Sequence, residues 1–127
     1  MSNGFQYLVK VLDRAFSKAV RQATADHAGV VKCYTCPNVF HWTQMDCGHF
    51  RRRQHLSTRW HEKNCKPQCK YCNQKLDGNE AVFAANLKLE YGDQIVDELT
   101  RMSKKDRKWS CSELKEMIEH YESKIIF

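Results

Sequence analysis

The chain has 127 residues, 42% of them hydrophobic and 28% charged, a composition typical of one folded domain and not of a disordered or collagen-like chain. Its formal net charge is +6. The sequence has neither a transmembrane stretch nor the basic and apolar regions of a secretion signal, so we expect no membrane partner and a cytoplasmic location, where clustered cysteines more often bind metal than form disulfides.

The first segment of the chain is helical in pattern. Apolar residues recur at three- and four-residue spacing from Asn3 to about Ala28, which predicts an amphipathic helix, and Gly29 suits its end. We expect one domain in three parts. They are an N-terminal helix (1–28), a cysteine-rich core (30–76) and a C-terminal helical region (77–127).

Helical periodicity is lost in the cysteine-rich core. Residues 39–42 and 44–50 read as two short strands that form a hairpin. Residues 51–63 resemble a loop or irregular arm, and residues 69–75 suit the start of a short helix. The core is therefore predicted to be a small mixed structure between helices, and the whole chain to be α+β.

The C-terminal region returns to helical spacing. Helices are predicted over Asn79–Tyr91 and Asp93–Met102, and Ser110 with Glu113 predicts a capping box that opens a last helix. These helices either close the domain or form a dimer interface.

Six of the seven cysteines lie in the core, and four of them form two CxxC pairs. The pairs are Cys33 with Cys36 and Cys69 with Cys72. Each pair can chelate one side of a tetrahedral ion, so the four predict a structural zinc site. Cys47 or Cys65 could replace one of these ligands. A redox role is disfavoured because neither pair lies in a βαβ pattern.

Three polar residues stand at fixed spacing around the second CxxC pair. His49 closes a predicted strand, Asn64 lies five residues before Cys69, and Asn73 directly follows Cys72. This order is similar to that of zinc-bearing HNH and endonuclease VII-like nucleases of the His-Me finger superfamily. More narrowly, the segment from Cys47 through Asn79, followed by a helix ending in Glu-Tyr-Gly, resembles the NinG/Rap family of lambdoid phages.

The resemblance implies a zinc-anchored ββα-metal (treble-clef-like) core and cleavage of branched DNA, such as Holliday junctions and D-loops, during recombination. It implies His49 as the base that activates water, Asn73 as a ligand of catalytic Mg²⁺ or Mn²⁺, and Asn64 as the residue that fixes the loop and orients His49. It further implies a location in the host cell's cytoplasm, a homodimer on symmetric junctions and recombination proteins as partners.

One position departs from the HNH pattern. Many HNH proteins carry an acidic metal ligand directly before the catalytic histidine, where this chain has Gly48. Asp46 could supply a carboxylate instead. On a regular strand Asp46 would face away from His49, whereas a bulge at Gly48 could re-aim it.

Positive charge is concentrated in the same core. Between Cys47 and Lys75 there are eight Lys or Arg residues and one acid, a local net of +7, which leaves about −1 for the rest of the chain. The eight are Arg51, Arg52, Arg53, Arg59, Lys63, Lys66, Lys70 and Lys75. We expect them to contact DNA phosphates without reading sequence.

Two rival classes share part of this pattern. A zinc-dependent DNA-binding module that cuts nothing would have the CxxC pairs and the basic residues, but would not require His49, Asn64 and Asn73 together. A protein-interaction adaptor would not require the concentrated charge.

Overall fold

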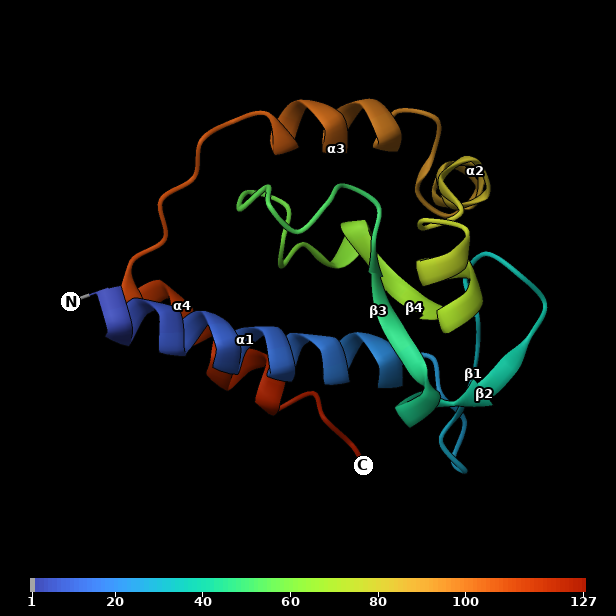
Figure 1. Ribbon diagram of the computed structural model, residues 1–127, viewed down its shortest axis with the longest axis horizontal. Coiled ribbons are helices and arrows are strands. Elements are labelled where there is room, and N and C mark those ends of the chain that lie inside the picture. The colour runs from blue at the N-terminus through green and yellow to red at the C-terminus, as the bar shows by residue number, and fades with distance from the viewer. Residues whose placement is uncertain (1) are drawn as a thin grey trace.

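Two helices from opposite ends of the chain pack together along one side of the molecule (Figure 1). They are α1 (Ser2–Gln22) and α4 (Cys111–Glu122) of the computed structural model, which describes residues 2–127; Met1 lies outside it. Their contact buries Leu12, Phe16 and Leu114. The architecture is mixed α and β, as predicted, and small sheets lie between the helices.

The end of α1 differs from the prediction. The helix stops at Gln22 instead of continuing to about Ala28. Asp26 is the physical reason, because its Oδ1 accepts the backbone N–H groups of Ala28 and Val30, both at 2.9 Å. Such a side chain offers the backbone partners that compete with helical hydrogen bonds.

The strands exist near their predicted positions, but the predicted hairpin between residues 39–42 and 44–50 is wrong. Strand β1 (Val30–Lys32) pairs with β2 (Val39–His41), and β3 (Met45–His49) pairs with β4 (Cys65–Cys69), both antiparallel. A turn of 3₁₀ helix, η1 (Trp42–Gln44), separates β2 from β3. That turn redirects the chain, so each strand pairs with a partner outside the predicted hairpin.

The helices after the sheets agree with the sequence pattern. A short helix, η3 (Tyr71–Lys75), follows β4, and α2 (Glu80–Tyr91) and α3 (Ile95–Ser103) come next. The capping box of α4 is confirmed, since the Ser110 side chain accepts the Glu113 N–H and the Glu113 side chain accepts the Ser110 N–H.

The chain between β3 and β4, residues 50–64, forms an arm that lies between α1 and α3 (Figure 1). It ends in one turn of 3₁₀ helix, η2 (Glu62–Asn64). Ser57 Oγ donates to the Met102 carbonyl at the end of α3, and Trp60 packs into the α1–α4 core. The arm is therefore held from both sides. Among residues 2–127, no helix is both long and apolar enough to cross a bilayer.

Candidate metal centre and adjoining polar site

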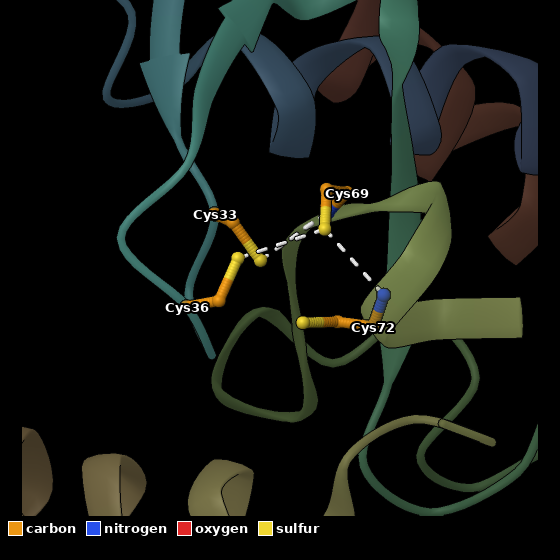
Figure 2. Close-up of side chains that lie close together, drawn as sticks. All are labelled: Cys33, Cys36, Cys69 and Cys72. Atoms are coloured by element: carbon orange, nitrogen blue, oxygen red, sulfur yellow. Dashed lines mark hydrogen bonds between the residues drawn. The ribbon is translucent and has the colours of Figure 1, made fainter. Parts of the chain in front are cut away.

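Four cysteine sulfurs from two distant segments meet beside the β1–β2 hairpin (Figure 2). Cys33 and Cys36 lie in the hairpin loop, Cys69 ends β4, and Cys72 lies in η3. Their Sγ atoms all lie within 4.8 Å of one another, and those of Cys36 and Cys69 are 3.7 Å apart. Tetrahedral Zn–S bonds of about 2.3 Å place sulfurs about 3.8 Å apart, so this spacing suits zinc.

Backbone N–H groups point at these sulfurs. Cys33 Sγ accepts from Thr35 N at 3.4 Å and Cys69 N at 3.3 Å, and Cys69 Sγ accepts from Cys72 N at 3.4 Å. Burial raises the pKa of the Cys33 thiol, but the Cys69 N–H and the Thr35 donors outweigh burial and bring that pKa to about 6. Donors aimed at sulfur stabilise the Cys33 thiolate, the form that binds zinc, whereas burial raises the pKa of the Cys36 and Cys69 thiols. The cluster therefore fits structural zinc.

Cys47 and Cys65, the alternative zinc ligands, lie outside this cluster. Together with His49 they form a second group whose ligand atoms also lie within 4.8 Å of one another. Cys111 is exposed at the start of α4. The four cysteines of the two CxxC motifs thus supply all four ligands of a tetrahedral ion, and none of the other three cysteines is needed.

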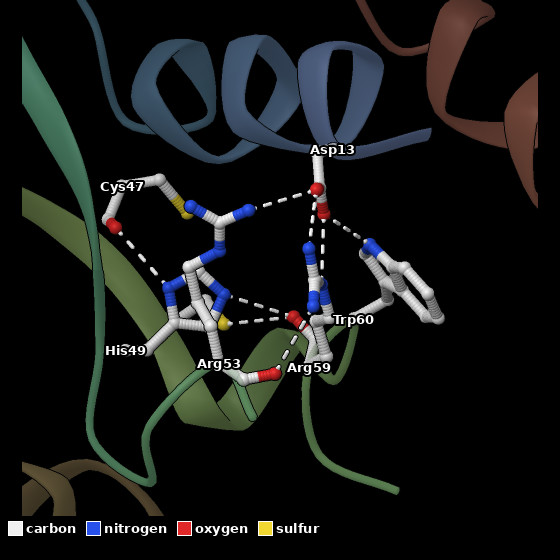
Figure 3. Close-up of polar contacts among 7 residues, drawn as sticks. Asp13, Cys47, His49, Arg53, Arg59 and Trp60 are labelled. Carbon is white, nitrogen blue, oxygen red and sulfur yellow. Dashed lines mark hydrogen bonds and ion pairs between the residues drawn. The ribbon is translucent and has the colours of Figure 1, made fainter. Parts of the chain in front are cut away.

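His49 ends β3, half-buried beside the arm (Figure 3). Its Nε2 lies 3.0 Å from the Arg59 carbonyl oxygen, and its Nδ1 lies 3.3 Å from the Cys47 carbonyl oxygen. Since a carbonyl only accepts, the shorter contact places the proton on Nε2 and leaves the lone pair on Nδ1. Burial is the largest cause that lowers the His49 pKa, so the ring is neutral near pH 7.

Asn64 is completely buried and holds both ends of the arm. Its Oδ1 accepts from Arg51 N at 2.8 Å, and its Nδ2 donates to the carbonyls of Arg51 (3.1 Å) and Thr58 (3.0 Å). Its backbone carbonyl accepts from Phe50 N. Asn64 thus fixes the segment whose Arg59 carbonyl contacts His49.

Asp13 is a site residue that the sequence reasoning missed (Figure 3). It lies on α1, and its carboxylate accepts from Arg59 Nη2 at 2.6 Å, Arg53 Nη2 at 2.9 Å and Trp60 Nε1 at 2.9 Å. Burial raises the Asp13 pKa, but the hydrogen bond and charge of Arg59 lower it overall. The available signal was an acid placed beside Leu12 in the apolar stripe of the helix.

Asp46, His49 and Asn73 border one cavity of about 290 Å³, which Asp13 and Arg53 also line. Asn73 Nδ2 donates to Asp46 Oδ2 at 2.9 Å. Asp46 also accepts from Gln74 Nε2 at 2.8 Å and pairs with Lys70 at 2.7 Å. Within residues 2–127, no hydrogen bond uses Asn73 Oδ1, so the Asn73 amide oxygen is available to a ligand.

Strand β3 has no bulge at Gly48, because its register with β4 is continuous from Met45 opposite Cys69 to His49 opposite Cys65. The bulge suggested for re-aiming Asp46 is therefore absent. Gln68 accounts for the glycine, since a Cβ on Gly48 would lie 1.9 Å from Gln68 Oε1. An acidic side chain at this position would require the buried Gln68 side chain to move.

The basic residues of the core divide into two kinds. Arg59 and Lys66 are mostly buried, with side chains 16% and 14% exposed, and pair with Asp13 and Glu90. Arg51 is half-buried and donates to Ser103 Oγ. The exposed ones are Arg52, Arg53, Lys63, Lys70 and Lys75. Arg52, Arg53 and Lys70 pair with Asp77, Asp13 and Asp46, so among the described basic residues of the core only Lys63 and Lys75 are exposed without an acidic partner.

Comparison with known proteins decides the family. The model of the family described as "Bacteriophage Lambda NinG protein" matches residues 3–126. The chain belongs to the NinG family. It is 28% identical over 120 residues to Protein ninG of Escherichia phage lambda and to that of Salmonella phage P22, and 27% identical to that of Escherichia phage 933W.

These NinG alignments cover 94% of the chain but only 56–57% of each relative. The chain thus spans a little over half the length of the NinG relatives. No solved structure matches the chain.

The zinc assignment in this NinG chain predicts a coupled loss of metal and stability. Cys36→Ser combined with Cys72→Ser should hold one zinc ion fewer per chain and melt at a lower temperature, because zinc binding and folding are coupled. Metal content by atomic emission and thermal unfolding by circular dichroism measure this. Cys111→Ser, in the exposed cysteine, is the control; equal zinc content in the double variant would refute the assignment.

The contact between Gly48 and Gln68 predicts a specific coupling. Gly48→Ala should lower the free energy of unfolding by about 1–3 kcal/mol through overpacking, and by clearly less in a Gln68→Ala background. Gly4→Ala is the control, since nothing lies within 4 Å of its added Cβ, and it should not destabilise α1. Urea unfolding of the four variants measures these free energies. An equal loss of unfolding free energy from Gly48→Ala in the wild-type and Gln68→Ala backgrounds would contradict the clash.

Proposed function

We propose that this chain is a metal-dependent DNA endonuclease of the HNH type, built on a zinc-anchored ββα-metal core. The observation that carries the proposal is the meeting of His49, Asn73 and Asp46 at one cavity, beside an arm that Asn64 holds. The order β3, β4, η3 supports it, with His49 ending the first strand and Asn73 in the following helix. Membership of the NinG family adds to it.

His49 is suited to act as a general base. The Arg59 carbonyl holds Nε2 and so fixes the tautomer, which leaves the Nδ1 lone pair for the proton of an attacking water. Burial lowers its pKa and keeps the ring neutral and able to accept that proton. A positioned imidazole of this kind contributes about 10²–10⁴-fold to a hydrolysis rate.

Asn73 is the residue proposed to hold the catalytic ion. Its amide oxygen is a hard ligand of the type that Mg²⁺ and Mn²⁺ accept, and its amide nitrogen is already engaged by Asp46. Asp46 is proposed as a positioning residue for Asn73, because its two oxygens already accept from Lys70, Asn73 and Gln74. When bound, the ion supplies charge stabilisation for the phosphoryl oxygens and the leaving oxygen.

The substrate we propose is branched DNA of recombination, such as Holliday junctions and D-loops, on the strength of the sequence resemblance. The exposed basic residues would contact phosphates, which fixes position without reading sequence. Symmetric cutting of a four-way junction requires two active sites, so the proposal includes a homodimer on that substrate. Recombination proteins are the partner class that this substrate implies.

Cleavage of labelled DNA tests the active site. Wild-type protein should nick a four-way junction or D-loop when Mg²⁺ or Mn²⁺ is present, and His49→Ala should bind the same DNA but cut about 10²–10⁴-fold more slowly. Gel analysis of initial rates, beside a gel-shift measurement of binding, separates chemistry from affinity.

His120→Ala, an exposed histidine on α4, is the control for that assay and should cut at the wild-type rate. Binding by the wild type without cleavage under any divalent ion would favour the non-catalytic zinc module. Cleavage by His49→Ala at the wild-type rate would remove His49 from the chemistry. Failure of the wild type to bind any of these DNAs, even at low salt, would favour the protein-interaction adaptor.

The exposed charges give a separate prediction. Arg52→Gln with Lys75→Gln should weaken DNA binding at low salt and reduce the slope of log Kd against log salt by about 1.8, because each lost phosphate contact releases about 0.9 fewer counterions. Lys115→Gln with Lys124→Gln removes the same charge from the α4 end and should leave the slope nearly unchanged. Equal slopes in the two double variants would contradict this surface.

A further inference from the structure

Strands β3 and β4 bring together a second potential metal-binding group beside the cavity. Cys47 and His49 are two residues apart on β3, and His49 lies opposite Cys65 on β4. Residues so placed share one face of a two-stranded sheet. The two sulfurs and a ring nitrogen of His49 lie within 4.8 Å of one another, the same spacing that the four-cysteine cluster satisfies.

The chemistry of this group differs from that of the proposed magnesium site. Two thiolates and an imidazole are soft to borderline ligands, typical of Zn²⁺, Cd²⁺ or Cu⁺ and unsuited to Mg²⁺. Cys65 is buried, while Cys47 and His49 border the cavity of about 290 Å³. Three protein ligands at a cavity wall leave a fourth position for water, as in open zinc sites.

Cationic side chains lie around the group. Arg53 and Arg59 lie beside His49 (Figure 3), and Arg21 lies close enough to Cys47 for their charges to interact. Burial raises the pKa of the Cys65 thiol well above its ordinary value, so a bound ion would have to displace that proton, and two thiolates would then neutralise one divalent ion.

We propose that Cys47, His49 and Cys65 form a second site for a soft divalent ion such as Zn²⁺, distinct from the four-cysteine cluster. A neutral imidazole has one lone pair, so a His49 that binds the ion cannot also accept a proton from water. The site would therefore make any nuclease activity sensitive to zinc. That consequence, unlike the binding itself, rests on the proposed function.

Binding is tested on the chain already loaded with zinc at the four-cysteine cluster and kept reduced. Added Co²⁺ should give a thiolate-to-metal charge-transfer band at one ion per chain, and dialysis against buffered Zn²⁺ should give two zinc ions per chain by atomic emission. Cys47→Ala should lose the band and hold one zinc ion, whereas Cys111→Ser should behave as wild type. Circular dichroism confirms that each variant is folded.

Cys65→Ala is a second ligand variant, and should raise the Co²⁺ concentration for half-saturation by more than about tenfold, as expected for a lost ligand. Wild-type protein that binds one zinc ion and gives no new band would overturn the site and leave the cysteines as packing residues. A band that persists in both Cys47→Ala and Cys65→Ala would overturn the ligand set.

A zinc titration of cleavage separates this inference from the proposed function. For each protein the rate with Mg²⁺ and added Zn²⁺ is divided by its own rate with Mg²⁺ alone. This ratio should fall with zinc in the wild type and much less in Cys47→Ala. If the chain binds a second zinc ion but no preparation cleaves DNA, the nuclease proposal is wrong and the second metal site stands. If the chain binds a single zinc ion and its cleavage of DNA does not respond to added zinc, the second metal site is wrong and the nuclease proposal stands.

Discussion

The pairing of β3 with β4 is the constraint on which the candidate site depends. The pairing places His49 opposite Cys65 and Met45 opposite Cys69, so one register positions both the polar site and half of the cysteine cluster. A slip of one residue would turn His49 to the other face of the strand. Zinc at the four-cysteine cluster would hold this register, because Cys69 and Cys72 would be tied to the β1–β2 loop.

Around His49 the structure relies on buried polar anchors more than on a large apolar core. The Asn64 side chain forms hydrogen bonds with three backbone groups of the arm. The Asp13 carboxylate accepts hydrogen bonds from the side chains of Arg59, Arg53 and Trp60. A buried polar group left without its partner costs about 1–3 kcal/mol, so each anchor strongly favours one conformation of the arm. The Arg59 carbonyl that contacts His49 Nε2 is thereby fixed from both α1 and η2. Such a preorganised environment suits the role of general base that we propose for His49.

Much of the fold could be predicted where the signal is local. The helices after Asp77, the Ser110–Glu113 capping box and the CxxC pairs all followed from periodicity or short motifs. Strand pairing could not be predicted, because strands of three to five residues carry little register information and the long arm of residues 50–64, not a tight turn, separates β3 from β4. Asp26 ended α1 earlier than periodicity suggested because its side chain competes for backbone N–H groups.

The candidate site likewise contains residues that local motifs indicated and residues that only long-range contacts bring together. His49, Asn64 and Asn73 came from the resemblance of their order around the second CxxC pair to HNH nucleases, and the structure brings His49 and Asn73 to one cavity. Asp13 was missed because its partners lie 40 or more residues away along the chain. The second group of ligands was missed for a related reason, since Cys47 and Cys65 become neighbours only through the β3–β4 register.

Long-range pairing also changes how the basic core is understood. A local net of +7 indicates a strong polyanion surface, yet acids from outside that segment, Asp13, Asp46, Asp77 and Glu90, pair with five of its eight basic residues. Exposed pairs such as Arg52 with Asp77 contribute little to stability and can exchange a carboxylate for a phosphate at little cost. The Arg59–Asp13 pair is mostly buried, so breaking it would leave an uncompensated charge. The surface proposed to contact DNA is therefore smaller than the charge count suggests, because the Arg59 guanidinium is tied to Asp13, where it holds the arm and is not free to bind a phosphate.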